Sequence, residues 1–161
     1  MSGLEVSLTI NSRLRSAKIE ARLSLLDFLR DHMALTGTHT GCEHGVCGAC
    51  SILLDGVPIR SCLMLAVQAQ DCHITTVEGL SNADGTPGPL QDAFIEAHGM
   101  QCGYCTPAML ISAQALLAQN DSPTIDEIKD AIGGNLCRCT GYVQIIESIQ
   151  LAAARLRERQ V

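Results

Sequence analysis

The chain has 161 residues, a formal net charge of −6 and 47% hydrophobic residues. An acidic chain is a poor match for nucleic acid, whose phosphates attract basic surfaces. No apolar run approaches the roughly 18 residues of a membrane-spanning helix, so we expect no membrane span. The first residues lack the basic and then apolar pattern of an export signal, so we expect a cytoplasmic protein.

Hydrophobic patterns in the first half predict a small α+β domain with a mixed sheet and one crossing helix. Val6, Leu8 and Ile10 alternate with polar residues, as strand residues do. Ser24 with Asp27 predicts a helix N-cap. The expected elements are strands at 6–10 and 14–19, a helix at 25–32, a hairpin at 51–59 around Asp55-Gly56, a helix at 63–69 and a strand at 74–77.

The second half predicts helices only. Residues 79–89 are rich in Gly, Pro and polar residues, which is typical of a linker. Beyond the linker we expect four helices, at 90–98, from Pro107 to a break at Ser122-Pro123, from the capping box of Thr124 and Glu127 to Gly133-Gly134, and after Gly141-Tyr142. We therefore predict one domain at 1–78, a linker at 79–89 and a helical domain at 90–161.

Eight of the nine cysteines form two quartets. The first is Cys42, Cys47, Cys50 and Cys62, and its C-x4-C-x2-C…C spacing is the plant-type ligand pattern of a [2Fe–2S] cluster. Three glycines, Gly41, Gly45 and Gly48, lie among these thiols. We expect them to adopt positive φ and to let backbone N–H groups face sulfur.

The second quartet is Cys102, Cys105, Cys137 and Cys139, a C-x2-C pair and a C-x-C pair. Taken alone, this pattern fits zinc nearly as well as iron and sulfur, because both accept four thiolates. Its occurrence beside a plant-type quartet favours a second [2Fe–2S] cluster. A disulfide framework is disfavoured because no export signal is visible. Cys72, the ninth cysteine, is expected to be a buried structural residue.

Two one-electron centres in one short chain indicate a relay. Iron that is fully ligated by thiolates leaves no open position for a substrate, unlike a catalytic metal. The sequence shows no Ser–His–Asp set, paired-carboxylate site or phosphate-binding glycine loop. We therefore assign no catalytic residue to this chain and expect the substrate pocket on another one.

Three motifs carry a family resemblance: Gly-Cys-Glu-His-Gly-Val-Cys-Gly-Ala-Cys at 41–50, Gln-Cys-Gly-Tyr-Cys-Thr-Pro at 101–107, and Gly-Asn-Leu-Cys-Arg-Cys-Thr-Gly-Tyr at 134–142. They closely resemble the iron–sulfur subunit of molybdenum hydroxylases, the xanthine oxidase family, in its bacterial three-subunit form. The resemblance spans nearly the whole chain. It implies an N-terminal β-grasp, plant-ferredoxin-like domain followed by a C-terminal all-α four-helix [2Fe–2S] domain.

The same resemblance implies cofactors and partners. A large subunit would hold molybdopterin beside the helical cluster, and a medium subunit would hold FAD beside the other. Gln101 matches the family glutamine that hydrogen-bonds the pterin, and Cys139 matches the cluster ligand closest to it. Electrons would pass from molybdenum through the second and then the first cluster to FAD. We expect a dimer of heterotrimers.

Two other classes of protein remain open from the residues alone. A free-standing two-cluster ferredoxin would dock transiently, although the helical half and the apolar composition favour permanent docking. A zinc-binding interaction module would be colourless. Among individual residues, His44 is expected to face solvent, and His32, His39, His73 and His98 have no visible partners. Arg138 either tunes the cluster or contacts the large subunit, or it is a surface residue in an ion pair.

Overall fold

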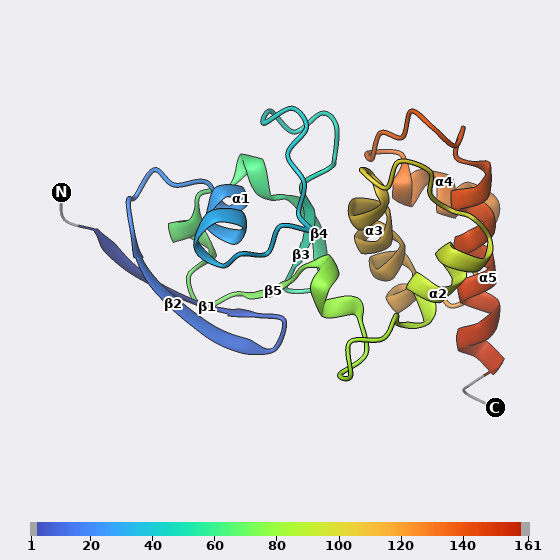
Figure 1. Ribbon diagram of the computed structural model, residues 1–161, viewed down its shortest axis with the longest axis horizontal. Coiled ribbons are helices and arrows are strands. Elements are labelled where there is room, and N and C mark those ends of the chain that lie inside the picture. The colour runs from blue at the N-terminus through green and yellow to red at the C-terminus, as the bar shows by residue number, and fades with distance from the viewer. Residues whose placement is uncertain (1–2, 159–161) are drawn as a thin grey trace.

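The computed structural model describes residues 3–158. The outer ends of the two predicted domains, residues 1–2 and 159–161, lie outside the described residues, as does the very start of the segment inspected for an export signal. The sheet half and the helical half lie side by side, and the two termini lie at opposite ends of the molecule (Figure 1). The predicted α+β class, a small mixed sheet followed by helices, is confirmed.

The N-terminal half is built on a five-stranded sheet with the strand order β2-β1-β5-β3-β4. Its strands are β1 (Leu4–Ile10), β2 (Arg13–Ile19), β3 (Ser51–Leu54), β4 (Val57–Arg60) and β5 (His73–Thr75). β1 pairs parallel with β5, and the other pairs are antiparallel. Both hairpin turns have positive φ at their two central residues, Asn11-Ser12 and Asp55-Gly56, as a type I′ turn requires.

The predicted helix at 25–32 is present in two parts. α1 (Leu25–Asp27) continues as a π-helical turn, η1 (Phe28–His32). Ser24 is the N-cap, and its hydroxyl accepts a 3.0 Å hydrogen bond from the Asp27 N–H. Leu25, Phe28 and Leu29 are fully buried against the apolar face of the sheet. This helix therefore covers one side of the sheet, as the sequence predicted.

The prediction of a continuous helix at 63–69 is wrong. Two short 3₁₀ turns, η2 (Ser61–Leu63) and η3 (Ala66–Ala69), take its place. Leu65 forms an isolated β-bridge with Ser24, which extends the chain between the two turns. The strand predicted at 74–77 is also shorter, because η4 (Val77–Leu80) begins where it was expected to end.

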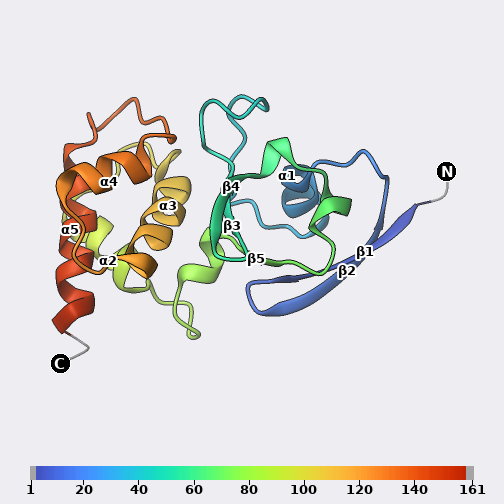
Figure 2. The same cartoon turned by 180° about the vertical axis from the view of Figure 1, so that it is seen from behind.

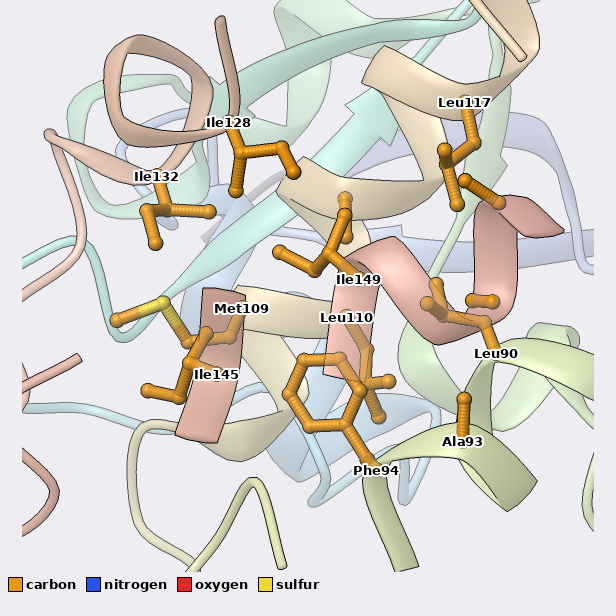
Figure 3. Close-up of a cluster of buried hydrophobic side chains, with 13 residues drawn as sticks. Leu90, Ala93, Phe94, Met109, Leu110, Leu117, Ile128, Ile132, Ile145 and Ile149 are labelled. Atoms are coloured by element: carbon orange, nitrogen blue, oxygen red, sulfur yellow. The ribbon is translucent and has the colours of Figure 1, made fainter. Parts of the chain in front are cut away.

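The C-terminal half contains the four predicted helices: α2 (Pro89–Glu96), α3 (Thr106–Gln119), α4 (Ile125–Ile132) and α5 (Val143–Glu158). Their inner faces form one apolar core. Phe94 of α2 points into it toward Met109 and Leu110 of α3 and Ile145 and Ile149 of α5 (Figure 3). Within residues 3–158, no helix is long and apolar enough to cross a membrane.

Helix α3 is buried on two sides. One side, with Met109, belongs to the helical core. The other places Ile111 and Ala115 against Leu53 of β3, so that α3 joins the two halves. A helix that is apolar around most of its surface is usually a buried one. The loop before β3 and the loop before α5 consequently lie at the same edge of the molecule (Figures 1 and 2).

Candidate iron–sulfur centres

The first quartet lies in the loop between η1 and β3 and in the turn that follows β4. Cys50 directly precedes β3, and Cys62 lies in η2. The hairpin β3–β4 reverses the chain, and Ser61 donates a 2.8 Å hydrogen bond from its hydroxyl to the Cys50 carbonyl. The hairpin therefore returns Cys62 to the loop, as the Asp55-Gly56 turn predicted.

Backbone N–H groups surround the thiols of this loop. The N–H of Cys47 lies 3.3 Å from the Cys42 sulfur, and the N–H of Ala49 lies 3.5 Å from the Cys47 sulfur. The hydrogen bond from Cys47, together with those from His44 and Val46, lowers the pKa of Cys42 to about 6. Such a curled loop favours anionic sulfur, as a thiolate ligand requires.

The glycines of the loop have two different roles. Gly45 and Gly48 have positive φ, at +83° and +73°, as expected. The expectation is wrong for Gly41, which is absent from the positive-φ residues, and Glu43 adopts φ +57° instead. A Cβ at Gly41 would lie 2.8 Å from the Cys47 sulfur. Gly41 is therefore required for space rather than for backbone conformation.

The second quartet joins two loops of the helical half. Cys102 and Cys105 precede α3, and Cys105 is the N-cap residue of that helix. Cys137 and Cys139 lie between α4 and α5. The sulfurs of Cys102 and Cys139 are 3.5 Å apart. All four cysteines therefore lie at a helix start or in the loop before a helix.

The thiols meet in pairs. The neighbouring thiols Cys47, Cys50 and Cys137 shift the pKa values of Cys42, Cys62 and Cys105, respectively, and the Cys102 and Cys139 sulfurs lie 3.5 Å apart. Within residues 3–158, no three His, Cys, Asp or Glu side chains are arranged to hold one metal ion. A zinc site would gather four ligands around one ion. Two pairs per quartet instead fit a binuclear cluster, in which each iron takes two thiolates.

Burial raises the pKa of three quartet thiols, Cys47, Cys62 and Cys105. Desolvation raises the pKa of Cys62 to about 11 and that of Cys105 to about 12, and each is raised further by its neighbouring thiol. Without a metal these two side chains keep their protons at neutral pH. Metal binding to such thiols displaces the protons, so cluster assembly is coupled to proton release.

The loop that holds Cys42 and the loop that holds Cys102 and Cys105 touch each other directly. The His39 ring stacks on the Tyr104 ring with centroids 4.7 Å apart, and its Nδ1–H donates a 2.7 Å hydrogen bond to the Tyr104 carbonyl. Tyr104 in turn donates its hydroxyl proton to the Thr40 carbonyl. The interpretation as a residue without a partner is therefore wrong for His39. The signal in the sequence was Tyr104, an aromatic residue between two cysteines. The same interpretation is also wrong for His73, whose Nδ1 lies 3.6 Å from an Asp55 carboxylate oxygen, and for His32, whose ring stacks on that of Phe28.

The remaining predicted residues are placed as follows. Gln101 is exposed next to two exposed cysteines, Cys102 and Cys139, so that the second quartet opens to the surface. His44 is exposed, as expected, and its Nδ1–H donates to the Cys42 carbonyl. Arg138 is exposed as well. Cys72 is half-buried, whereas it was expected to be buried.

Comparison with known proteins defines the class. Residues 8–79 match the family described as 2Fe-2S iron-sulfur cluster binding domain, and residues 76–150 match the [2Fe-2S] binding domain. The chain is thus a two-centre [2Fe–2S] protein. It is 54% identical to the caffeine dehydrogenase subunit gamma of Pseudomonas sp. (strain CBB1), over 93% of this chain and 91% of that one. It belongs to the family of small iron–sulfur subunits of molybdenum hydroxylases.

Other relatives agree. The nicotine 6-hydroxylase small subunit of Paenarthrobacter nicotinovorans is 51% identical over 91% of this chain and 87% of its own length. The crystal structure of quinoline 2-oxidoreductase from Pseudomonas putida 86 matches all of this chain with a TM-score of 0.94 and 48% identity. The predictions of two [2Fe–2S] clusters and of an electron-transfer subunit of a molybdenum-containing oxidoreductase are confirmed.

Proposed function

We propose that the chain holds one [2Fe–2S] cluster in each half. Cys42, Cys47, Cys50 and Cys62 would ligate the first cluster, and Cys102, Cys105, Cys137 and Cys139 the second. The pairwise contacts of the thiols support this assignment. The two domains would span 1–78 and 90–161 with the linker at 79–89, which is supported by the two family matches meeting at residues 76–79.

When bound, the clusters supply single-electron chemistry, which a relay between two partner sites requires. The chain itself brings the two cluster loops into contact. The observation that carries the proposal is the hydrogen bond of 2.9 Å from the Leu136 N–H to the Cys47 carbonyl. Cys47 belongs to the first quartet, and Leu136 directly precedes Cys137 of the second. The two centres are therefore connected by the backbone as well as by proximity.

The second centre would face the large subunit and its molybdopterin. Gln101, Cys102 and Cys139 are all exposed there. A Gln side chain offers both hydrogen-bond donors and an acceptor, which suits a pterin ring edge. This agrees with the role that the resemblance implies for Gln101, and with Cys139 as the ligand nearest the pterin.

The first centre would face the medium subunit and its FAD. Two large apolar side chains lie exposed beside it, Val46 at 62% and Leu63 at 65%. Leu63 packs on the cysteine loop, since a Cβ at Gly45 would lie 2.5 Å from its Cδ1. Exposed apolar residues grouped around a redox centre are typical of a surface that a partner covers. We extend the proposal to a dimer of heterotrimers.

We propose that the complex is cytoplasmic and oxidises a nitrogen heterocycle. Within residues 3–158 no two cysteines form a disulfide, which suits a reducing compartment. Similar chains carry the names of caffeine, nicotine and nicotinate enzymes. The purified complex would then reduce a dye with nicotinate or quinoline faster than with benzaldehyde. A preference for the aldehyde would contradict this substrate class.

The relay is tested by purifying the chain under native conditions together with the products of the neighbouring genes. We expect co-elution with a molybdenum subunit and a flavin subunit, about four iron atoms per chain, and two distinct EPR signals after reduction. A brown protein that elutes alone at 17.1 kDa would instead identify a free-standing ferredoxin.

A further inference from the structure

A polar network lies between the loop before β3, which holds Cys42, Cys47 and Cys50, and the loop before α5, which holds Cys137 and Cys139. It contains none of the proposed ligands' side chains. Its centre is Asn135, which is only 1% exposed. The Asn135 amide nitrogen donates to the Gly48 carbonyl at 3.1 Å and to the Ser51 hydroxyl at 3.0 Å. Its amide oxygen accepts from the Ser112 hydroxyl at 2.9 Å. Asn135 therefore links the second loop, the first loop and helix α3.

Arg60 adds a second link between the same loops. One guanidinium nitrogen donates to the Ser51 hydroxyl at 2.8 Å, and the other donates to the Gly134 carbonyl at 2.6 Å. The Ser51 hydroxyl donates to the Gly48 carbonyl at 2.5 Å. This hydroxyl thus uses its one donor and both of its acceptor positions, which is its full capacity.

The backbone around this network is closely packed. A Cβ at Gly48 would lie 2.3 Å from the Gly134 carbonyl oxygen, and a Cβ at Gly134 would lie 2.3 Å from the Arg60 guanidinium. Both glycines therefore allow the two loops to approach. The segments 47–51 and 134–137 are held together at the point where the Leu136 N–H meets the Cys47 carbonyl.

The network fixes the relative position of the two halves, which the apolar contact between them does not. Leu53, Ile111 and Ala115 already hold β3 and α3 together. Dispersion contacts of this kind lack direction, whereas a satisfied set of hydrogen bonds fixes one relative position of its members. Buried polar groups are expensive to keep and are best attested where they fix a register.

We propose that Asn135 and Arg60 are positioning residues of the relay and that they set the separation and orientation of the two centres. This rests on the proposed function. With both clusters bound, one electron would pass from the reduced second centre to the oxidised first centre, with no bond or proton exchanged. Because this transfer depends on distance, its rate depends on the two side chains although neither ligates iron.

The first test is Asn135→Asp in the purified complex. The substitution keeps the shape and the acceptor for Ser112, but it turns an anionic oxygen toward the Gly48 carbonyl, and the loops move apart. We expect full iron content, a changed magnetic coupling between the two reduced centres in EPR, and a several-fold slower redistribution of electrons in freeze-quench EPR. Gln150→Glu makes the same amide-to-carboxylate change on the exposed side of α5 and should leave all three unchanged.

Arg60→Lys provides an independent test if the Asn135→Asp variant loses iron. Arg60 is only half-buried, and lysine keeps the charge but cannot reach two acceptors at once. We expect unchanged midpoint potentials with a changed coupling and a slower redistribution. A purely structural role would lower the thermal stability and leave the coupling and the rate at their wild-type values.

The outcomes distinguish failure of the positioning role from failure of the proposed function. Wild-type coupling and rate in Asn135→Asp with full iron, or in Arg60→Lys, overturn the positioning role while leaving the relay intact. If the wild-type complex itself shows fewer than two reduced centres, the proposed function fails first.

Discussion

The Leu136 N–H donates a 2.9 Å hydrogen bond to the carbonyl oxygen of Cys47, across the boundary between the two domains. Cys137 directly follows Leu136. The backbones of two proposed ligands, Cys47 and Cys137, are therefore connected through one hydrogen bond. Such a contact forms only if the backbones of both loops come very close. Gly48 allows that close approach, because a Cβ at this position would lie 2.3 Å from the Gly134 carbonyl oxygen.

Gly48→Ala should destabilise the protein more than Gly56→Ala does. Both glycines have positive φ, +73° and +83°, so each substitution costs about 1–2 kcal/mol of backbone strain. A Cβ meets nothing within 4 Å at Gly56 but lies 2.3 Å from the Gly134 oxygen at Gly48. Overpacking adds about 1–3 kcal/mol. Denaturant unfolding of the two variants measures the difference, and equal losses would contradict the close approach.

Cys62→Ala should remove the first cluster and leave the second. The iron content is expected to fall from about four to about two atoms per chain, with one EPR signal lost. Cys72→Ala is the matched control, because Cys72 lies outside both quartets and should keep both signals. Loss of a signal in Cys72→Ala, or of both in Cys62→Ala, would contradict the assignment of ligands.

The sequence predicts the elements whose signals are local. The alternation of Val6, Leu8 and Ile10 specifies a strand wherever its partner lies, and the capping box of Thr124 and Glu127 specifies a helix start. The cysteine spacing is equally local, because a loop of fixed length must surround a cluster of fixed size. These predictions therefore needed no knowledge of the tertiary structure.

The structure differs from the prediction where contacts between segments distant in the sequence determine the local conformation. The helix expected at 63–69 is interrupted because Leu65 pairs with Ser24, which lies far away in the sequence. The second buried side of α3, with Ile111, faces a strand from the other half. Asn135 looks like an ordinary polar residue of a glycine-rich turn until its partner Gly48 is known. Contacts of this kind leave no periodic signal.

His39→Ala should loosen the loop that holds Cys42 and the loop that holds Cys102 and Cys105 together. The substitution removes the ring stack on Tyr104 and the hydrogen bond to its carbonyl, which together are worth about 1–2 kcal/mol. We expect faster hydrogen exchange in residues 38–47 and 102–106 and faster loss of iron to a chelator. His98→Ala replaces an exposed histidine of the helical half and should change neither rate. Faster exchange in only one loop would show that the stack does not couple them.

Removal of both clusters should loosen the cysteine loops but leave the rest of the fold. Each half has an apolar core whose buried members are not cluster ligands, around Phe28 in the sheet half and around Phe94 in the helical half, although Cys105 and Cys137 pack against the second core. We therefore expect the far-UV circular dichroism to retain most of its helical signal after iron and sulfide are removed. Hydrogen exchange should rise sharply at 41–50 and 134–142, where the Leu136 N–H donates to the Cys47 carbonyl and the Asn135 side chain donates to the Gly48 carbonyl, and little in α3. Complete unfolding of the apoprotein would show instead that the clusters, and not these cores, hold the two halves in their native form.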